Sequence, residues 1–248
     1  MKQRNFYWLF ASVAFFGNVV GSNTLPMSNE YNNIVEKVAD SAVDSNEDSS
    51  FESTASSLYS SLDLNSFIAP SRDVFTKALK GYYQLAETGK VKNEKLTIVD
   101  FSLSSAKPRL WVIDMKENTI LLQSLVAHGK KTGEEYATTF SNRINSHMSS
   151  LGFYTTGETY TGRNGFSLRL DGLEAGINDK ARERAIVIHG ADYASPDLVR
   201  SQGKLGRSYG CPAVPFAVNE ELIDMIKDKS LLFIYYPSNQ YLNNSKIV

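Results

Sequence analysis

Cysteine is almost absent from this chain, which has one such residue, Cys211, among its 248. A lone cysteine cannot form a disulfide within the chain, so it is a buried structural thiol, an intermolecular partner or a reactive thiol. An excess of positive charge is also missing, because the formal net charge is −1. Nucleic acid is therefore not an expected partner, since its phosphates require a basic patch or stripe.

Histidine is scarce too, and its three occurrences are His128, His147 and His189. None of them shows the i, i+4 or short paired spacing of common zinc motifs. We therefore expect no metal site and no cofactor. His147 precedes a run of small residues, where it is either a hydrogen-bonded loop residue or part of a cleft.

Long apolar runs are missing except near the N-terminus, where residues 6–20 follow the basic Lys2 and Arg4 and precede Gly21 and Ser22. This order of charged, apolar and small residues is typical of a secretory signal, which we place at residues 1–22. The apolar run is shorter than the roughly 20 residues that span a bilayer, and an uncleaved anchor is the alternative. With the signal cleaved, we expect an exported protein without an integral membrane domain.

Basic residues are absent from one long segment, residues 41–66, which is rich in serine and carries five acidic residues. Such a segment buries too little apolar surface to offset the entropy lost when its backbone is ordered. We therefore expect residues 23–70 to form a mostly disordered tether. The polar residues 239–248 are expected to form a loose tail, which leaves residues 71–238 as the folded domain.

The predicted domain begins with a helix and continues as a series of strands. Ser71 is a suitable N-cap, apolar residues follow it at helical spacing, and Gly89 is suited to end the helix. A second helix is expected with Asn219 as its N-cap. Runs of β-branched and aromatic residues predict strands at 96–101, 110–114, 120–127, 151–156, 166–170, 185–189 and 231–236. This pattern predicts a mainly β fold, a β-sandwich or barrel-like sheet with peripheral α-helices.

Two segments carry residues suited to covalent chemistry. His189 lies near the end of the segment 186–190 (IVIHG), and Cys211 follows it by 22 residues in the segment 206–212 (GRSYGCP). An imidazolium lowers a neighbouring thiol's pKa by several units, so we expect His189 to stabilise a Cys211 thiolate. Pro212 has no N–H, so an oxyanion must be held by donors such as the N–H groups of Gly210 and Cys211 or by a nearby side chain. By spacing alone, a structural cysteine and a structural histidine explain the pattern equally well.

The His-Gly pair at a strand end, followed by Ser-x-Gly-Cys, resembles the signature of the YkuD-type L,D-transpeptidases. Residues 97–236 resemble one branch of them, the murein L,D-transpeptidase catalytic-domain proteins. Several segments agree in order: 126–129 (VAHG), 140–142 (FSN), 146–154 (SHMSSLGFY), 167–174 (SLRLDGLE), 185–192 and 205–215. The resemblance implies a β-rich fold in which Cys211 is the nucleophile and His189 is its base. It also implies that the backbone carbonyl of Gly190 orients the imidazole and that Ser208 and Gly210 shape the site.

The sequence departs from the commoner signature at two positions beside the cysteine. Tyr209 stands where histidine is common, and Ala213 stands where arginine or asparagine is usual. The separation of His189 from Cys211 is also longer than usual. These departures put the contacts with the acyl donor in doubt. Four further residues are candidates for a substrate groove: His147, Tyr154, Asp192 and Tyr193.

The resemblance implies an enzyme of the bacterial periplasm or cell envelope whose partners are peptidoglycan stem peptides. Its reaction would cleave the bond between an L-centre and the terminal D-Ala of a tetrapeptide stem and transfer the acyl group to an amine acceptor. With water as acceptor, the same site is an L,D-carboxypeptidase. Two further hypotheses are a different envelope thiol peptidase and a non-catalytic peptidoglycan-binding protein with an inert cysteine.

Overall fold

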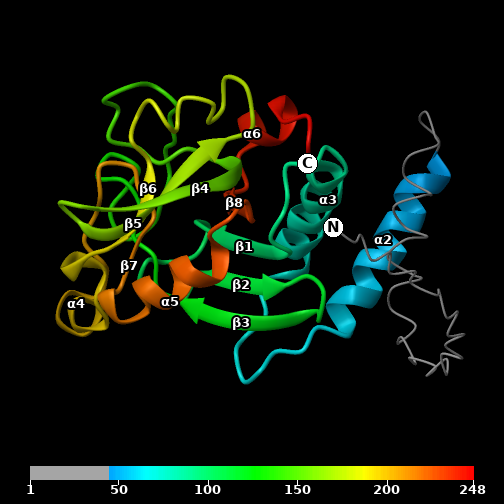
Figure 1. Cartoon of the computed structure of the whole chain (residues 1–248), viewed down its shortest axis with the longest axis horizontal. Coiled ribbons are helices and arrows are strands. Elements are labelled where there is room, and N and C mark those ends of the chain that lie inside the picture. Colours follow the sequence, from blue (N-terminus) through cyan, green and yellow to red (C-terminus); the bar gives the residue numbers. More distant parts are fainter. Residues whose placement is uncertain (1–44) are drawn as a thin grey trace, which may run out of the picture. The chain divides into compact units, whose positions relative to one another are not determined.

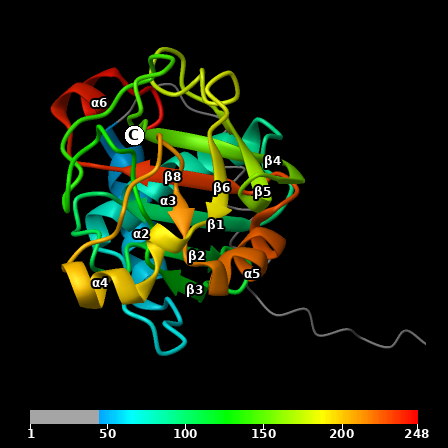
Figure 2. The same ribbon diagram turned by 90° about the vertical axis from the view of Figure 1, so that its left-hand side faces the viewer.

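Eight strands form one mixed, nearly barrel-like sheet in the computed structural model, which describes residues 45–248 (Figures 1 and 2). Their order in the sheet is β3-β2-β1-β8-β4-β5-β6-β7. The pairs β1·β8 and β6·β7 are parallel, and the other neighbours are antiparallel. The strands are β1 (Lys95–Asp100), β2 (Leu110–Asp114), β3 (Thr119–Ser124), β4 (Gly152–Gly162), β5 (Gly165–Gly172), β6 (Val187–Gly190), β7 (Ala213–Val214) and β8 (Leu231–Tyr235). The predicted mainly β fold with peripheral helices is confirmed.

Helix α3 (Arg72–Glu87) forms where the sequence predicts it. The Ser71 side chain accepts a hydrogen bond from the Val74 N–H, as an N-cap does. The apolar positions of the helix are buried, and it packs on β1 and β8. This burial of one face stabilises the helix more than its intrinsic propensity does.

The second predicted helix begins earlier than expected. Helix α5 (Phe216–Ile226) starts directly after Pro215, whose fixed φ of −55° suits a helix entrance. Asn219 is therefore not an N-cap. It is buried, and its side-chain amide donates to the carbonyl oxygen of Phe166 at 2.8 Å.

The tether prediction is wrong for residues 45–70, and residues 1–44 lie outside the described part of the chain. Helix α2 (Ser45–Ser60) packs on α3. Ala55 is fully buried, and the rings of Tyr59 and Phe75 meet edge to face with centroids 5.4 Å apart. The reason is an apolar stripe at helical spacing within the serine-rich segment: Phe51, Ala55, Leu58 and Tyr59.

The predicted loose tail is also ordered. Helix α6 (Asn239–Asn244) buries Tyr241, whose hydroxyl donates to Glu174 Oε1 at 3.1 Å. The Ser245 hydroxyl donates to the other oxygen of Glu174 at 2.5 Å. A buried carboxylate requires such donors, and this one holds the C-terminal segment against the domain.

The predicted signal segment, residues 1–22, lies among the residues that the structure does not describe. Within residues 45–248, no helix combines the length and the apolar character needed to cross a bilayer.

Candidate active site

The parallel pair β6·β7 brings the strand that carries His189 beside the short strand that follows Cys211. His189 lies opposite Ala213, and Cys211 precedes Ala213 by two residues. Cys211 itself lies in the bend just before β7, so the loop that carries the thiol begins beside the strand end that carries His189. Segments that are distant in the sequence thereby meet at the end of two short strands (Figure 2).

The imidazole of His189 is oriented by the next residue in the chain. Its Nδ1 lies 2.9 Å from the carbonyl oxygen of Gly190, and its Nε2 lies 3.5 Å from the Tyr193 hydroxyl. Because a carbonyl oxygen only accepts, Nδ1 carries the hydrogen in this contact and Nε2 keeps its lone pair. Burial lowers the pKa of His189, an effect that the Gly190 hydrogen bond opposes. The ring is therefore neutral at pH 7, with a basic nitrogen free to take a proton.

The thiol of Cys211 is turned toward the beginning of β6. Its Sγ lies 3.7 Å from the carbonyl oxygen of Ala185. Burial raises the pKa of Cys211, while the Val187 backbone N–H and the positive charge of Arg184 lower it. Among the hydrogen bonds of residues 45–248, none joins this thiol to His189. The resting pair is thus a thiol and a neutral imidazole, whereas we expected His189 to stabilise a Cys211 thiolate.

Ser208 holds the loop that carries the cysteine. Its Oγ donates to the carbonyl oxygen of Cys211 at 2.7 Å and accepts from the Gly210 N–H at 3.0 Å. Gly210 has φ of 125°, and a Cβ at this position would lie 2.7 Å from the Met148 carbonyl oxygen, so only glycine fits.

This arrangement alters the expected set of oxyanion donors. The Gly210 N–H is already bound to Ser208, whereas no described residue accepts a hydrogen bond from the N–H of Cys211. The Cys211 N–H is therefore the backbone donor that is free beside the thiol.

The four groove candidates have different positions. Tyr193 contacts His189, and burial together with the nearby Cys211 charge raises the pKa of its phenol. His147 packs its ring against the exposed ring of Tyr209, with centroids 4.6 Å apart. Asp192 is exposed at the start of the short 3-10 helix η1 (Asp192–Ala194). Tyr154 does not line a groove, because it is 1% exposed and its hydroxyl donates to the Ser150 carbonyl oxygen at 3.0 Å.

Arg184 is a site residue that the sequence reasoning missed. It is half-buried near Cys211 and ties the segment 141–150 to the turn before β6. Its position one residue before the strand-like run 185–189 was the only local signal, because its hydrogen-bond partners lie more than 30 residues away in the chain.

His128 belongs to a separate buried cluster. Arg109, which is fully buried, donates to His128 Nδ1 at 2.8 Å and to the carbonyl oxygens of Val126 and Leu103 at 2.9 and 2.7 Å. Burial lowers the pKa of Arg109 to about 9. Burial and the charge of Arg109 lower the pKa of His128 to about 4. This histidine is therefore a neutral hydrogen-bond acceptor in the core.

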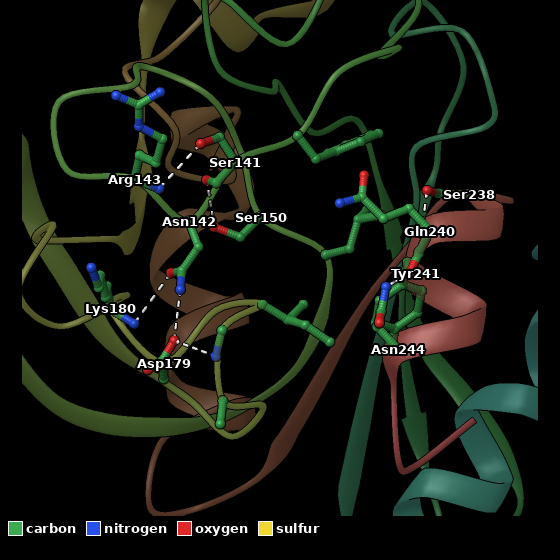
Figure 3. Close-up of a pocket in the computed structure, with 15 residues that line it drawn as sticks. Ser141, Asn142, Arg143, Ser150, Asp179, Lys180, Ser238, Gln240, Tyr241 and Asn244 are labelled. Atoms are coloured by element: carbon green, nitrogen blue, oxygen red, sulfur yellow. Dashed lines mark hydrogen bonds between the residues drawn. The ribbon is translucent and has the colours of Figure 1, made fainter.

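A cavity of about 630 Å³ lies between the segment 140–151 and helix α6. Figure 3 shows the residues that line it. Hydroxyl, amide and charged side chains face it, including Asn142 and Lys180 on one wall and Gln240 and Asn244 on the other. Neither Cys211 nor His189 lines it. The cavity adjoins the segment that Arg184 holds, since Ser141 and Ser150 both line the cavity and bind that guanidinium.

Solved structures with similarity to this chain include an L,D-transpeptidase from Mycobacterium smegmatis, at 15% identity and a TM-score of 0.36, covering 58% of this chain and 59% of that one. An Enterococcus faecium L,D-transpeptidase shows 15% identity and a TM-score of 0.35, covering 58% and 50% of the two chains. The helical cell shape determining protein of Campylobacter jejuni shows 14% identity and a TM-score of 0.39, covering 66% and 57%. The chain thus spans about half to three-fifths of the length of these solved chains.

No curated protein matches the chain. The family model of the L,D-transpeptidase catalytic domain matches residues 69–235. This match includes every strand of the sheet and both residues of the His189–Cys211 pair. Since it covers well over half of the 248 residues, the chain belongs to the L,D-transpeptidase catalytic domain family.

Proposed function

We propose that this chain is an exported cell-wall L,D-transpeptidase with Cys211 as nucleophile and His189 as general base. The observation that carries the proposal is the orientation of the imidazole: Nδ1 binds the Gly190 carbonyl, which leaves Nε2 its lone pair. The pairing of β6 with β7 places this histidine beside the strand that Cys211 precedes by two residues. Family membership supports the reaction class. The substrate is the tetrapeptide stem of peptidoglycan, and the site of action is the bacterial envelope.

The first half of the reaction is acylation of the cysteine. The thiol turns from Ala185 toward His189, transfers its proton to Nε2 and attacks the carbonyl carbon of the L-centre that precedes the terminal D-Ala. The oxyanion accepts a hydrogen bond from the free N–H of Cys211. The carbon–nitrogen bond then breaks, the imidazolium protonates the departing D-Ala amine, and a thioester remains on Cys211.

The second half transfers the acyl group. An amine of another stem peptide loses a proton to His189 and attacks the thioester, and the imidazolium returns a proton to the sulfur as it leaves. Water in place of the amine gives a tripeptide, which is the L,D-carboxypeptidase alternative. Neutral His189 suits both steps, because its basic nitrogen is available at pH 7.

The experiment incubates the purified protein with defined disaccharide tetrapeptides and follows the products by mass spectrometry. We expect dimers that have lost one D-Ala, whereas tripeptide monomers alone would support the carboxypeptidase. The matched variants are Cys211→Ala and His189→Gln, and both are expected to lower turnover by at least about 1000-fold. Undiminished turnover by Cys211→Ala would overturn the mechanism, and binding without turnover by the wild type would support a non-catalytic peptidoglycan-binding protein.

A further inference from the structure

The guanidinium of Arg184 is held entirely by neutral oxygen atoms. It donates to the Ser141 carbonyl oxygen at 2.8 Å and to the Ser146 hydroxyl at 3.3 Å. It also donates to the Met148 carbonyl oxygen and to the Ser150 hydroxyl. These four acceptors come from one segment, 141–150, so the guanidinium is fixed in position.

This cation has no anionic partner in the resting structure. Among residues 45–248, no carboxylate lies within ion-pair distance of Arg184. The side chain is half-buried, and burial lowers its pKa. A cation that is taken from water without a countercharge is costly, unless an anion forms beside it at some stage.

The anion that can form beside Arg184 is the thiolate of Cys211. A Cβ on Gly210, the residue before Cys211, would lie 3.2 Å from a terminal nitrogen of the guanidinium. The charges of Arg184 and Cys211 also stabilise each other, and Arg184 is the charged side chain that acts on the thiol. Tyr193, the other titratable side chain on which the Cys211 charge acts, is neutral at pH 7, and so is His189.

Because His189 is neutral, a fixed positive charge is needed to favour ionisation of the Cys211 thiol. An imidazolium is disfavoured by burial, and so is a thiolate, which means that the pair alone resists ionisation. Ala213 supplies no charge at the position where the commoner signature has arginine or asparagine. Arg184 reaches the same loop from the turn before β6 and carries its charge at neutral pH.

We propose that Arg184 stabilises the negative charge of the Cys211 sulfur during catalysis. The inference rests on the proposed role of Cys211 as nucleophile. The only atom transfer it includes is loss of the thiol proton, which goes to His189 in the reaction and to solvent in the test below.

A purely structural role, in which Arg184 merely ties down the segment 141–150, predicts a different response to substitution. Arg184→Lys keeps the charge but loses most of the hydrogen bonds, whereas Arg184→Gln loses the charge. Arg207→Gln is the matched control, since Arg207 also donates to backbone carbonyl oxygens, at Lys130 and Gly133, but pairs with Glu134.

The measurement is the rate of alkylation by iodoacetamide between pH 6 and pH 10 on the full-length protein, followed by mass spectrometry. Because Cys211 is the one cysteine of the chain, alkylation reports on it alone. We expect Arg184→Gln to lower the rate at pH 7.5 about tenfold and to raise the midpoint of the pH profile by about one unit. Arg184→Lys should stay within about threefold of the wild type, and Arg207→Gln should match it.

Equal losses in the Lys and Gln variants, or a wild-type midpoint in Arg184→Gln, would overturn the proposal. Circular dichroism verifies that each variant folds. If Arg184→Gln does not fold, the alkylation rate of Arg184→Lys tests the proposal instead. A rate more than about tenfold below that of the wild type would then count against a role for the charge. Alkylation needs no peptidoglycan. An inactive wild type with a normal Arg184 effect would therefore refute the proposed function and leave the role of the charge intact.

Discussion

Ser208 Oγ reaches past Tyr209 to the backbone of the next two residues, accepting from the Gly210 N–H and donating to the carbonyl oxygen of Cys211. This one hydroxyl fixes the turn that presents the thiol. Because the Gly210 N–H is bound to this hydroxyl, it is not available to an oxyanion. The N–H of Cys211 is the backbone donor that remains for that role.

Ser208→Ala should lower both turnover and stability. The substitution leaves a buried N–H and a carbonyl oxygen without partners, which costs about 1–3 kcal/mol. We expect kcat to fall about tenfold or more, because the loop loses its fixed geometry. Thermal denaturation and turnover of disaccharide tetrapeptide test this. Ser201→Ala, at an exposed hydroxyl of helix α4 (Pro196–Gln202), is the control and should match the wild type.

Tyr193 and Tyr154 should respond oppositely to loss of their hydroxyls. Tyr193→Phe removes a group 3.5 Å from the reactive nitrogen of His189, so turnover should fall by about threefold or more while the melting temperature stays near that of the wild type. Tyr154→Phe removes a buried hydrogen bond to Ser150, so stability should fall by about 1 kcal/mol while turnover of the folded protein is kept. A loss of turnover without a loss of stability in Tyr154→Phe would instead support a place for Tyr154 in the substrate groove.

The pH profile of turnover should have an acidic limb set by His189. Activity requires the neutral imidazole, and burial lowers the pKa of His189. Activity is therefore expected to persist as the pH falls below about 6.5, the ordinary value for histidine, and to be lost only at lower pH. The measurement is kcat/KM between pH 4 and pH 8, and an inflection at or above the ordinary value would contradict the burial of a neutral base.

Acid should destabilise the folded protein through His128. Its folded-state pKa of about 4 lies below the ordinary value, so between these limits the unfolded chain binds more protons than the folded one. Stability from this group is complete above about pH 6.5 and decreases by up to about 3 kcal/mol as the pH falls toward 4. His128→Asn keeps an acceptor for Arg109 without titrating, and its urea-unfolding free energy should fall less over the same interval.

Removal of residues 239–248 should destabilise the domain. Glu174 is buried and accepts from Tyr241 and Ser245, and the truncation leaves its carboxylate with the Phe153 N–H as its remaining short contact. Loss of these bonds and of the buried Tyr241 ring should cost at least about 3 kcal/mol in unfolding free energy. Glu174→Gln in the truncated chain should restore part of the loss, because a neutral amide is less costly to leave unpaired.

The sequence predicted those parts of the fold that depend on local periodicity. The apolar spacing of helix α3 and the β-branched runs of β1 and β2 are such cases, because each buries a continuous face. Helix α2 was not predicted, because the segment is mostly serine and acidic residues and its four apolar residues are few among them. Strand β7 has two residues and no periodicity at all.

The site was predictable only in part, because only some of its contacts join residues that are close together in the sequence. His189 and Cys211 stand in recognisable motifs, and the carbonyl of Gly190 is adjacent in the chain. Arg184 carries no motif, since all its acceptors lie on the segment 141–150, and folding alone brings them within reach. The binding of the Gly210 N–H by Ser208 likewise depends on a turn that no residue pattern specifies.

The last strand of the chain lies at the centre of the sheet. β8 pairs with β1 on one side and β4 on the other, and it is the link between β3-β2-β1 and the half that carries His189 and Cys211 (Figure 1). During synthesis, β3-β2-β1 can therefore be joined to β4-β5-β6-β7 only after residues 231–235 have been made. Until β8 is in place, no strand of the described sheet connects β1 with β4, and the two halves of the sheet stay separate.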